Sequence, residues 1–414
     1  MIEVIKHTLP NGLKLLIHQD FSTPIASFNL LYNVGAKDEH PEKTGFAHLF
    51  EHLMFGGSVN IPVYDEPLER VGGENNAFTN NDITNYYLTL PVENIETAFW
   101  LESDRMLSLA FTKKSLDVQR NVVVEEFNQR YLNQPYGEVW LHLRPLAYKV
   151  HPYMWATIGK SVEHIKSATL NDVKNFFYSH YAPNNSILCV AGPIEPNAII
   201  ELTNKWFGPI GKRDVVERNL PKEPTQTSPR KLEIERDVPF NAIYKAYHMC
   251  NRNHADFPAT DLMSDLLSNG KSARLYQRLV KEKQLFSNVN AYITGDIDAG
   301  LFIITGQLYP TTTYEQAEIA INEEISVLQN EPVSAYELEK VQNKYESNFT
   351  FEETSVLNKA MNLAFYELLG DANSINLEVQ KYRSVTPEHI QTIAQKILKE
   401  DNCSTLYYKS NQNK

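Results

Sequence analysis

Stretches that alternate apolar and polar residues recur along the chain, separated by longer stretches of helical periodicity. Residues 27–35 (SFNLLYNVG), 83–91 (ITNYYLTLP) and 186–192 (SILCVAG) are typical of β-strands, and MIEVIKHTLPNGLKLLIHQD at the start predicts a hairpin around its Pro-Asn-Gly turn. Residues 115–134 have the pattern of a helix. Since such strands can be joined by hairpins, we expect an α+β fold in which a largely antiparallel sheet has helices packed on one face.

The sequence also repeats itself. The segment HLFEHLMFGGS, which begins at His48, matches DLMSDLLSNGKS, which begins 213 residues later at Asp261. Near the end of each copy, the segment around Thr169 matches the segment around Thr386, 217 residues later. Similar offsets at both ends predict two tandem copies of one domain. The predicted parts are an N-terminal domain at 1–212, a polar, proline-bearing linker at 213–231 and a homologous C-terminal domain at 232–414.

Length and composition agree with this organisation. The chain has 414 residues, enough for two or three domains, with 42% hydrophobic and 22% charged residues. Its net charge of −12 argues against a nucleic-acid-binding protein. Its three cysteines lie far apart in the sequence and form no CxxC pair, so neither a disulfide framework nor a cysteine zinc site is indicated. No apolar run approaches the roughly 20 residues that span a bilayer. The expected location is the cytoplasm, with removal of a leader peptide left open.

One predicted helix carries candidate chemistry. The segment TGFAHLFEHLMFGGS can begin a helix at Thr44 and end it at Gly56. His48 and His52 then stand one turn apart on the same face, and Glu51 leans toward the same side. This H-x-x-E-H order is that of the inverted zincins. Two neutral imidazoles can hold one zinc ion, and a carboxylate that is not a ligand can act on water beside it.

The alternative is a solvated helix face that carries these residues by chance. Residues 46–55 are mostly apolar, which predicts a buried helix, and buried ionisable groups are costly unless a partner such as a metal pairs with them. The second copy has Asp261, Ser264 and Asp265 at the matching positions. Packing of this helix therefore does not by itself require the histidines, which favours the metal hypothesis.

A site with two histidines needs a third protein ligand. In the helix predicted at 115–134, Gln119 and Glu126 share a face, while Glu125 points about 100° away. Glu126 is therefore the better candidate of the two glutamates. Taken alone, its residue type favours an ordinary surface glutamate.

These segments together resemble the insulinase/pitrilysin family of zinc metallopeptidases, most of all its short bacterial members and the subunits of mitochondrial processing peptidase. The resemblance rests on HLFEHLMFGGS, GGENNAFTNNDITNYYLTLP and QRNVVVEEFNQR, and it extends over essentially the whole chain. It implies one zinc ion per chain, bound by His48, His52 and Glu126, with Glu51 as the general base.

The resemblance also carries expectations about substrate and partner. It implies that Asn76 and Ala77 lie near an edge strand that pairs with substrate. The family's glutamate seven residues before the third ligand is Gln119 here, which keeps hydrogen bonding beside the site but loses the charge. Val280 and Ser287 stand where the second half normally contributes an Arg/Tyr pair. We therefore expect a homologous subunit to supply that pair in a heterodimer, with a homodimer as the alternative.

The expected function is that of a zinc-dependent endopeptidase. It would hydrolyse unfolded or extended peptides inside a chamber formed by the two domains and a partner subunit, with substrate added as a strand to a sheet edge. The alternative is a non-catalytic peptide-binding or scaffold subunit of a peptidase complex. Such subunits tend to lose the metal motif, whereas this chain keeps all four residues. Zinc content and chelator-sensitive cleavage separate the two hypotheses.

Overall fold

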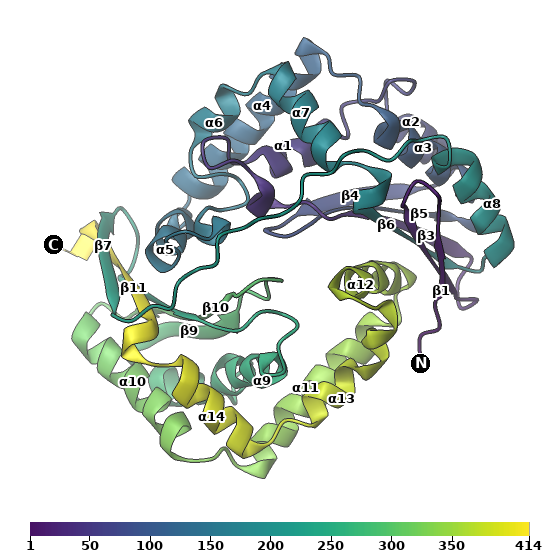
Figure 1. Cartoon of the computed structure of the whole chain (residues 1–414). Helices are drawn as coiled ribbons and strands as arrows, with labels where there is room; N and C mark the ends of the chain where they lie inside the picture. The colour runs from purple at the N-terminus through teal and green to yellow at the C-terminus, as the bar shows by residue number, and fades with distance from the viewer. Residues whose placement is uncertain (414) are drawn as a thin grey trace. The chain divides into compact units, whose positions relative to one another are not determined.

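The computed structural model describes residues 1–413, which divide into two compact units (Figure 1). Unit 1 comprises Met1–Gln129, Trp155–Leu220 and Thr350–Leu377. Unit 2 comprises Arg130–Met154, Pro221–Phe349 and the chain from Glu378 on. Each unit therefore takes most of its residues from one half of the sequence and one segment from the other half. The boundaries drawn from the sequence repeat stay a prediction.

Unit 1 contains one six-stranded sheet. Its strands are β1 (Ile5–Thr8), β2 (Lys14–Gln19), β3 (Ile25–Tyr32), β4 (Glu74–Thr79), β5 (Thr84–Pro91) and β6 (Ser186–Gly192). They lie in the order β1-β2-β6-β3-β5-β4, with β2 and β6 parallel and all other neighbours antiparallel. The helices of this unit are α1 (Phe46–Leu53), α2 (Asp65–Arg70), α3 (Ile95–Leu107), α4 (Lys113–Phe127), α6 (Val162–Lys166), α7 (Leu170–His180), α8 (Pro196–Phe207) and α12 (Val356–Leu369).

Helices cover both faces of the sheet in unit 1. On the face toward α3 and α8, Phe28 of β3 packs against Phe99 and Phe207, with ring centroids 5.0 and 6.3 Å away. On the opposite face lies α12, which packs on β3 and β6 although it comes from the second half of the sequence (Figure 1). Because side chains alternate along a strand, Asn29 and Asn85 point to this second face. Both are buried and joined by a 2.8 Å hydrogen bond.

Unit 2 contains one five-stranded sheet. Its strands are β7 (Arg230–Arg236), β8 (Ala242–His248), β9 (Phe286–Ile293), β10 (Leu301–Leu308) and β11 (Cys403–Ser410). They lie in the order β7-β11-β8-β10-β9, with β7 and β11 parallel and the others antiparallel. The helices of this unit are α5 (Val139–Ala147), α9 (Phe257–Ser268), α10 (Tyr314–Asn330), α11 (Ala335–Glu352), α13 (Glu378–Arg383) and α14 (Pro387–Ile397). The last turn of α11, from Thr350 on, belongs to unit 1.

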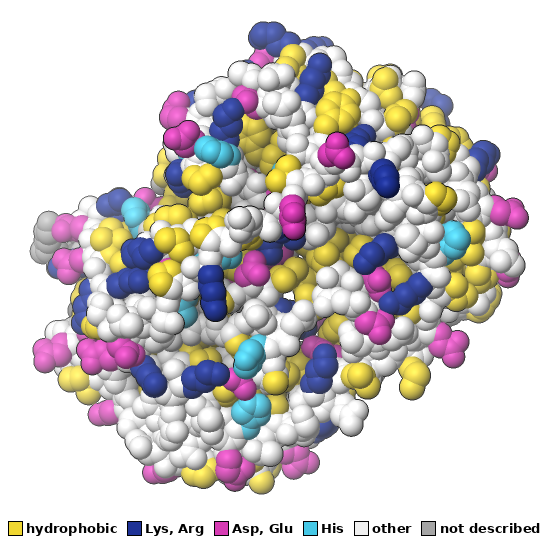
Figure 2. Space-filling model, in the orientation of Figure 1, with side chains coloured by type: hydrophobic (Ala, Val, Ile, Leu, Met, Phe, Trp, Pro, Cys, Tyr) yellow, Lys and Arg dark blue, Asp and Glu magenta, His cyan; other side chains and the backbone are white. Residues whose placement is uncertain are grey.

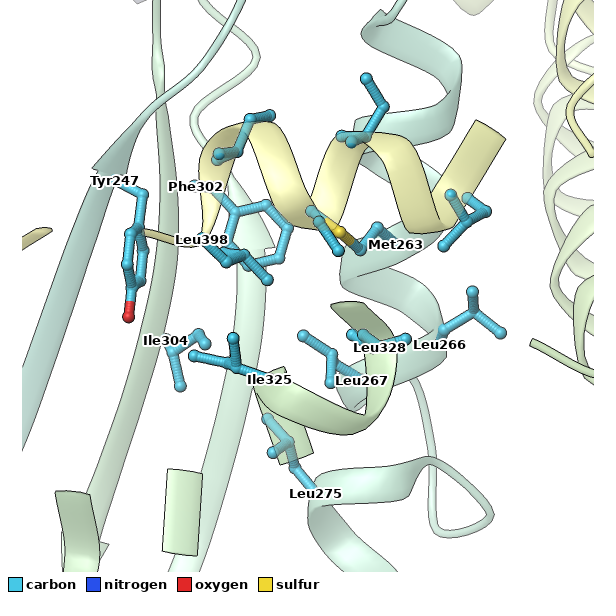
Figure 3. Packing of buried hydrophobic residues seen from close by; sticks show 14 of the residues in the cluster. Tyr247, Met263, Leu266, Leu267, Leu275, Phe302, Ile304, Ile325, Leu328 and Leu398 are labelled. Atoms are coloured by element: carbon cyan, nitrogen blue, oxygen red, sulfur yellow. The ribbon is translucent and has the colours of Figure 1, made fainter. Parts of the chain in front are cut away.

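The sheet of unit 2 is also buried on both faces. Phe302 of β10 packs with Met263 of α9 and Ile325 of α10 in one apolar layer (Figure 3). The next residue along β10, Ile303, packs on the other face with Leu143 of α5. This second layer depends on α5, a helix that comes from the first half of the sequence.

The two sheets have the same topology. When β1 is left out, the five strands of each unit, counted along the chain, lie in the spatial order first, fifth, second, fourth, third. The single parallel pair, between the first and fifth strands, is also the same. The α+β class and the two homologous domains are therefore confirmed. Each sheet has helices on both faces instead of one, because each unit receives a helix from the other half of the sequence.

The surface has mixed character. Among residues 1–413, no helix combines the length and the apolar character needed to cross a membrane. On the face drawn in Figure 2, acidic and basic side chains are interspersed, with hydrophobic side chains singly or in small groups between them. The acidic side chains on this face are therefore not gathered in one place.

Candidate metal site

The sequence of α1 explains its position in unit 1. The helix begins at Phe46, two residues after Thr44, and Gly45 precedes it with a left-handed φ of +89°, which glycine adopts without strain. A Cβ atom at Gly45 would lie 2.6 Å from the carbonyl oxygen of Ile158. The buried residues of the helix are Phe46, Ala47, Leu49, Phe50 and Leu53. The ionisable residues between them are left partly buried.

His48 and His52 of α1 and Glu126 of α4 lie close together. Each offers one ligand atom, and the three atoms lie within 4.8 Å of one another. The Nε2 atoms of His48 and His52 are 3.6 and 3.4 Å from Oε2 of Glu126, and the two imidazole rings are nearly perpendicular. Among the residues that the structure describes, this is the one group of three histidine, cysteine or carboxylate side chains arranged to hold a metal ion.

The spacing of these atoms fits zinc. Donor atoms about 2.0–2.1 Å from a tetrahedral zinc ion are about 3.3–3.5 Å apart, and the two distances from the imidazoles to the carboxylate, 3.6 and 3.4 Å, are close to this range. The same distances are longer than the usual 2.7–3.2 Å of an N–H···O hydrogen bond. Two imidazole nitrogens and one carboxylate oxygen form a known zinc donor set that leaves a fourth position open. The residues present therefore suit a zinc ion.

The other residues predicted near the site lie on the same two helices. Glu51 is half-buried on α1. Burial of Tyr86 raises the pKa of Tyr86 well above its usual range, and the nearby charge of Glu51 adds to this increase. Glu125 is exposed, in contrast to its neighbour Glu126. Gln119 is half-buried on α4, and its side chain makes no hydrogen bond within residues 1–413.

Asn76 and Ala77 lie on β4, at one edge of the sheet in unit 1. Within the described residues, β4 pairs on one side only, with β5. The side chain of Asn76 is exposed, and its Oδ1 accepts a 2.8 Å hydrogen bond from the backbone N–H of Ala77. Because α1 packs against β4 and β5, this edge lies beside the helix that carries the histidines.

A buried ion pair is linked to α1 through Tyr86. Arg105 and Glu102 of α3 are both 1% exposed and joined by two hydrogen bonds of 2.8 and 2.5 Å. The guanidinium group also lies over the rings of Tyr64 and Tyr86, 4.5 and 4.4 Å from their centroids. The Tyr86 hydroxyl in turn donates to the carbonyl of Phe50 in α1, at 3.4 Å. The sequence pattern did not reveal this support, because its members come from separate elements.

Sequence reasoning also missed Glu39. Its carboxylate accepts hydrogen bonds from the backbone N–H groups of Gly45 and Ala47, both at 2.8 Å. Burial raises the pKa of Glu39 to about 8, although the two hydrogen bonds act to lower it. Glu39 lies in a loop without periodicity, so no pattern distinguished it from the other acidic residues nearby.

The matching helix in unit 2 has a different chemistry. Asp261 of α9 accepts a 2.7 Å hydrogen bond from the hydroxyl of Tyr382, and Asp265 accepts one of 2.7 Å from the side chain of Asn269. Ser264 donates to the carbonyl of Asp261 in its own helix. The polar groups of α9 are thus bound by neighbours within unit 2.

Comparison with protein families places both halves of the chain. The family model described as Insulinase (Peptidase family M16) matches residues 14–154, which include the three candidate ligands and Glu51. The model described as Peptidase M16 inactive domain matches residues 167–345, which include α9. The chain belongs to the M16 insulinase family of peptidases.

Individual relatives agree with the family. Zinc protease PqqE of Helicobacter pylori is 28% identical over 410 residues, covering 97% of this chain and 92% of that protein. The crystal structure of a protease from Helicobacter pylori is 28% identical, with a TM-score of 0.92 over 99% of this chain and 100% of that one. The probable mitochondrial-processing peptidase subunit beta of Arabidopsis thaliana is 26% identical, covering 71% of this chain and 57% of that protein. The chain is thus a zinc protease homologue with a candidate zinc site.

Proposed function

We propose that this chain is a zinc-dependent endopeptidase that hydrolyses unfolded or extended peptides. The convergence of His48, His52 and Glu126 carries the proposal, because their donor atoms have the identity and spacing that a hydrolytic zinc site requires. Similarity over nearly the whole chain to a protein named as a zinc protease supports the same activity.

Each residue of the site has a separate role in this mechanism. His48, His52 and Glu126 would hold the zinc ion, which would supply a Lewis acid able to polarise a carbonyl and to lower the pKa of water. Glu51 lies on the same helix, one turn from His48, but outside the set of three ligands. It takes a proton from the attacking water and delivers it to the leaving amine nitrogen, as a general base and then a general acid.

The substrate binds along the edge of β4. An extended peptide placed there forms main-chain hydrogen bonds with the strand, including the stretch around Asn76 and Ala77. This mode favours unfolded peptides, because the backbone groups of a folded substrate are already paired. Because α1 packs against β4, a peptide bound along β4 would have its scissile bond near the histidines of α1.

A homologous partner subunit completes the activity. Val280 and Ser287 cannot replace an arginine and a tyrosine, and the nearby Arg274 is bound to Glu337 by hydrogen bonds of 2.8 and 3.0 Å. The relative named as subunit beta of a processing peptidase supports assembly with another subunit. The purified chain should cleave peptides slowly, and a homologous chain that carries the Arg/Tyr pair should raise the rate. Full activity of the isolated chain would contradict this part of the proposal.

Zinc analysis combined with a cleavage assay tests the proposed function. We expect about one zinc ion per chain and cleavage of an unstructured fluorogenic peptide that stops with a chelator and returns with added zinc. His52→Ala should lose both zinc and cleavage. Cleavage that survives complete removal of metal would overturn the proposal. Zinc binding without cleavage, with and without the partner, would favour the non-catalytic subunit instead.

A further inference from the structure

The first turn of α1 is held by a carboxylate from outside the helix. Glu39 is 5% exposed, and each of its two oxygens accepts one backbone hydrogen bond, Oε2 from Gly45 and Oε1 from Ala47. The first amides of a helix have no partner within the helix, and they carry the positive end of its dipole. The two oxygens of one buried carboxyl group therefore accept from two of these amides.

The loop that carries Glu39 is itself firmly held. The indole N–H of Trp155 donates a 2.9 Å hydrogen bond to the carbonyl of Ala36. Next to it, Lys37 forms a buried ion pair with Asp82 at 2.7 Å. A carboxylate on such a loop has little freedom to move, so it fixes the end of the helix to which it is bonded.

This fixed end lies next to a candidate ligand. Ala47, whose amide is bound by Glu39, directly precedes His48 in the chain. His48 and His52 belong to α1, whereas Glu126 belongs to α4. The spacing of the three donor atoms therefore depends on how α1 is rotated and shifted against α4. Holding the first turn of α1 restricts both movements.

The start of the matching helix in unit 2, α9, can be compared with this arrangement. Its N-cap residue, Asp256, makes no side-chain hydrogen bond to the helix backbone. The carboxylate of Asp256 accepts instead from the side chains of Lys396 and His389. The carboxylate at the start of α9 is thus bound by other side chains, whereas that of Glu39 is bound by the backbone of α1.

We propose that Glu39 is a positioning residue for the metal site. Its two hydrogen bonds orient α1 so that His48 and His52 meet Glu126 at the spacing that zinc requires. Glu39 touches neither the metal nor the substrate, and it acts through the backbone of α1. This inference rests on the zinc site of the proposed function.

The substitution Glu39→Gln tests this role. Glutamine occupies nearly the same space, but its amide nitrogen cannot accept a hydrogen bond, so one of the two helix N–H groups loses its acceptor. We expect the zinc affinity, measured by competition with a chromophoric chelator, to fall about tenfold. The visible absorption spectrum of the cobalt(II)-loaded protein should also change, because it reports ligand geometry. Neither measurement depends on activity.

Two further variants complete the experiment. Glu223 of unit 2 also accepts backbone hydrogen bonds, from Lys149, Val150 and His151 at 2.8–3.0 Å, so Glu223→Gln makes the same chemical change away from α1. It should leave zinc affinity and the cobalt spectrum unchanged. Glu39→Asp keeps the carboxylate on a shorter side chain and should give an affinity between those of the wild type and Glu39→Gln.

The outcomes separate this proposal from the proposed function. Unchanged zinc affinity and cobalt spectrum in Glu39→Gln, even with a lower Tm, would reduce Glu39 to a cap that stabilises the helix and overturn the proposal. Failure of both Glu39 variants to fold would also overturn it, since the residue would then serve the fold as a whole. A wild-type chain that binds no zinc would instead overturn the proposed function.

Discussion

The helices α1 and α9 occupy the same place in two copies of one fold but carry different chemistry. Each follows the second common strand of its sheet, and the two sheets share strand order and direction. At matching positions, α1 has His48, Glu51 and His52, and α9 has Asp261, Ser264 and Asp265. The polar groups of α9 are bound by neighbours in unit 2, whereas the imidazoles of α1 face a carboxylate from another helix. The fold therefore accepts either set, and the metal site is an addition to one copy.

The largest expected effect is on kcat and comes from a change at Glu51 of α1. Glu51→Gln should lower kcat by about 10²–10⁴-fold, because glutamine cannot take a proton from water, while the zinc content stays unchanged. Peptide cleavage kinetics and metal analysis of the same preparation measure both. The matched change in α9, Ser264→Ala, should leave kcat unaltered. Near-normal turnover of the glutamine variant would remove Glu51 from the mechanism.

Substitutions of the adjacent Glu125 and Glu126 in α4 test which of them is the third metal ligand. Glu126→Gln should weaken zinc binding more than about 100-fold, since it removes a ligand rather than a group that supports one. Glu125→Gln changes an exposed residue and should bind zinc as the wild type does. Chelator competition measures both affinities. Equal loss in the two variants, or a loss confined to Glu125→Gln, would contradict the geometry of the site.

The counterpart of His48 in unit 2 predicts a dependence of stability on pH. Burial raises the pKa of Asp261 to about 6, despite its hydrogen bond from Tyr382. The folded protein then holds this proton more tightly than the unfolded chain does, so stability should fall as pH rises from about 4 to about 6. Asp261→Asn should remove that slope and raise the free energy of unfolding at pH 7 by up to about 3 kcal/mol. Denaturant titrations across this pH range measure it, and a less stable variant at pH 7 would refute the prediction.

The smallest effect concerns Arg274, an arginine of unit 2 that lies six residues before Val280 in the sequence. Its hydrogen bonds hold the pKa of Glu337 at about 2, so the stability that the pair contributes is complete above about pH 4.5 and is lost as pH falls toward 2. Glu337→Gln should cost about 1–2 kcal/mol at neutral pH and flatten this acid limb in a denaturation series. The exposed ion pair of Arg278 and Glu282 offers a control, in which Glu282→Gln should change stability little. A gain in peptidase activity with Glu337→Gln would show that Arg274 had been withheld from catalysis.

Some parts of the fold and site follow from local pattern, and others do not. Helical phase was enough to group His48, Glu51 and His52 and to prefer Glu126 over Glu125, because side-chain direction repeats every 3.6 residues. The alternation in β3 predicted a strand with one buried face. It could not show that α12, more than 300 residues later in the chain, also covers the face that carries Asn29. Asn29 is buried on that face, and its hydrogen bond with Asn85 satisfies polar groups that would otherwise be costly to bury.

The sequence by itself determined the repeat, the fold class and the residue types able to bind zinc, since periodicity and side-chain chemistry are properties of short segments. The tertiary structure alone decided which helix covers which sheet face, that the Glu126 carboxylate lies 3.4 Å from His52, and that Glu39 binds the first turn of α1. These are contacts between separate elements, and they depend on how whole surfaces pack together rather than on the pattern within any one segment.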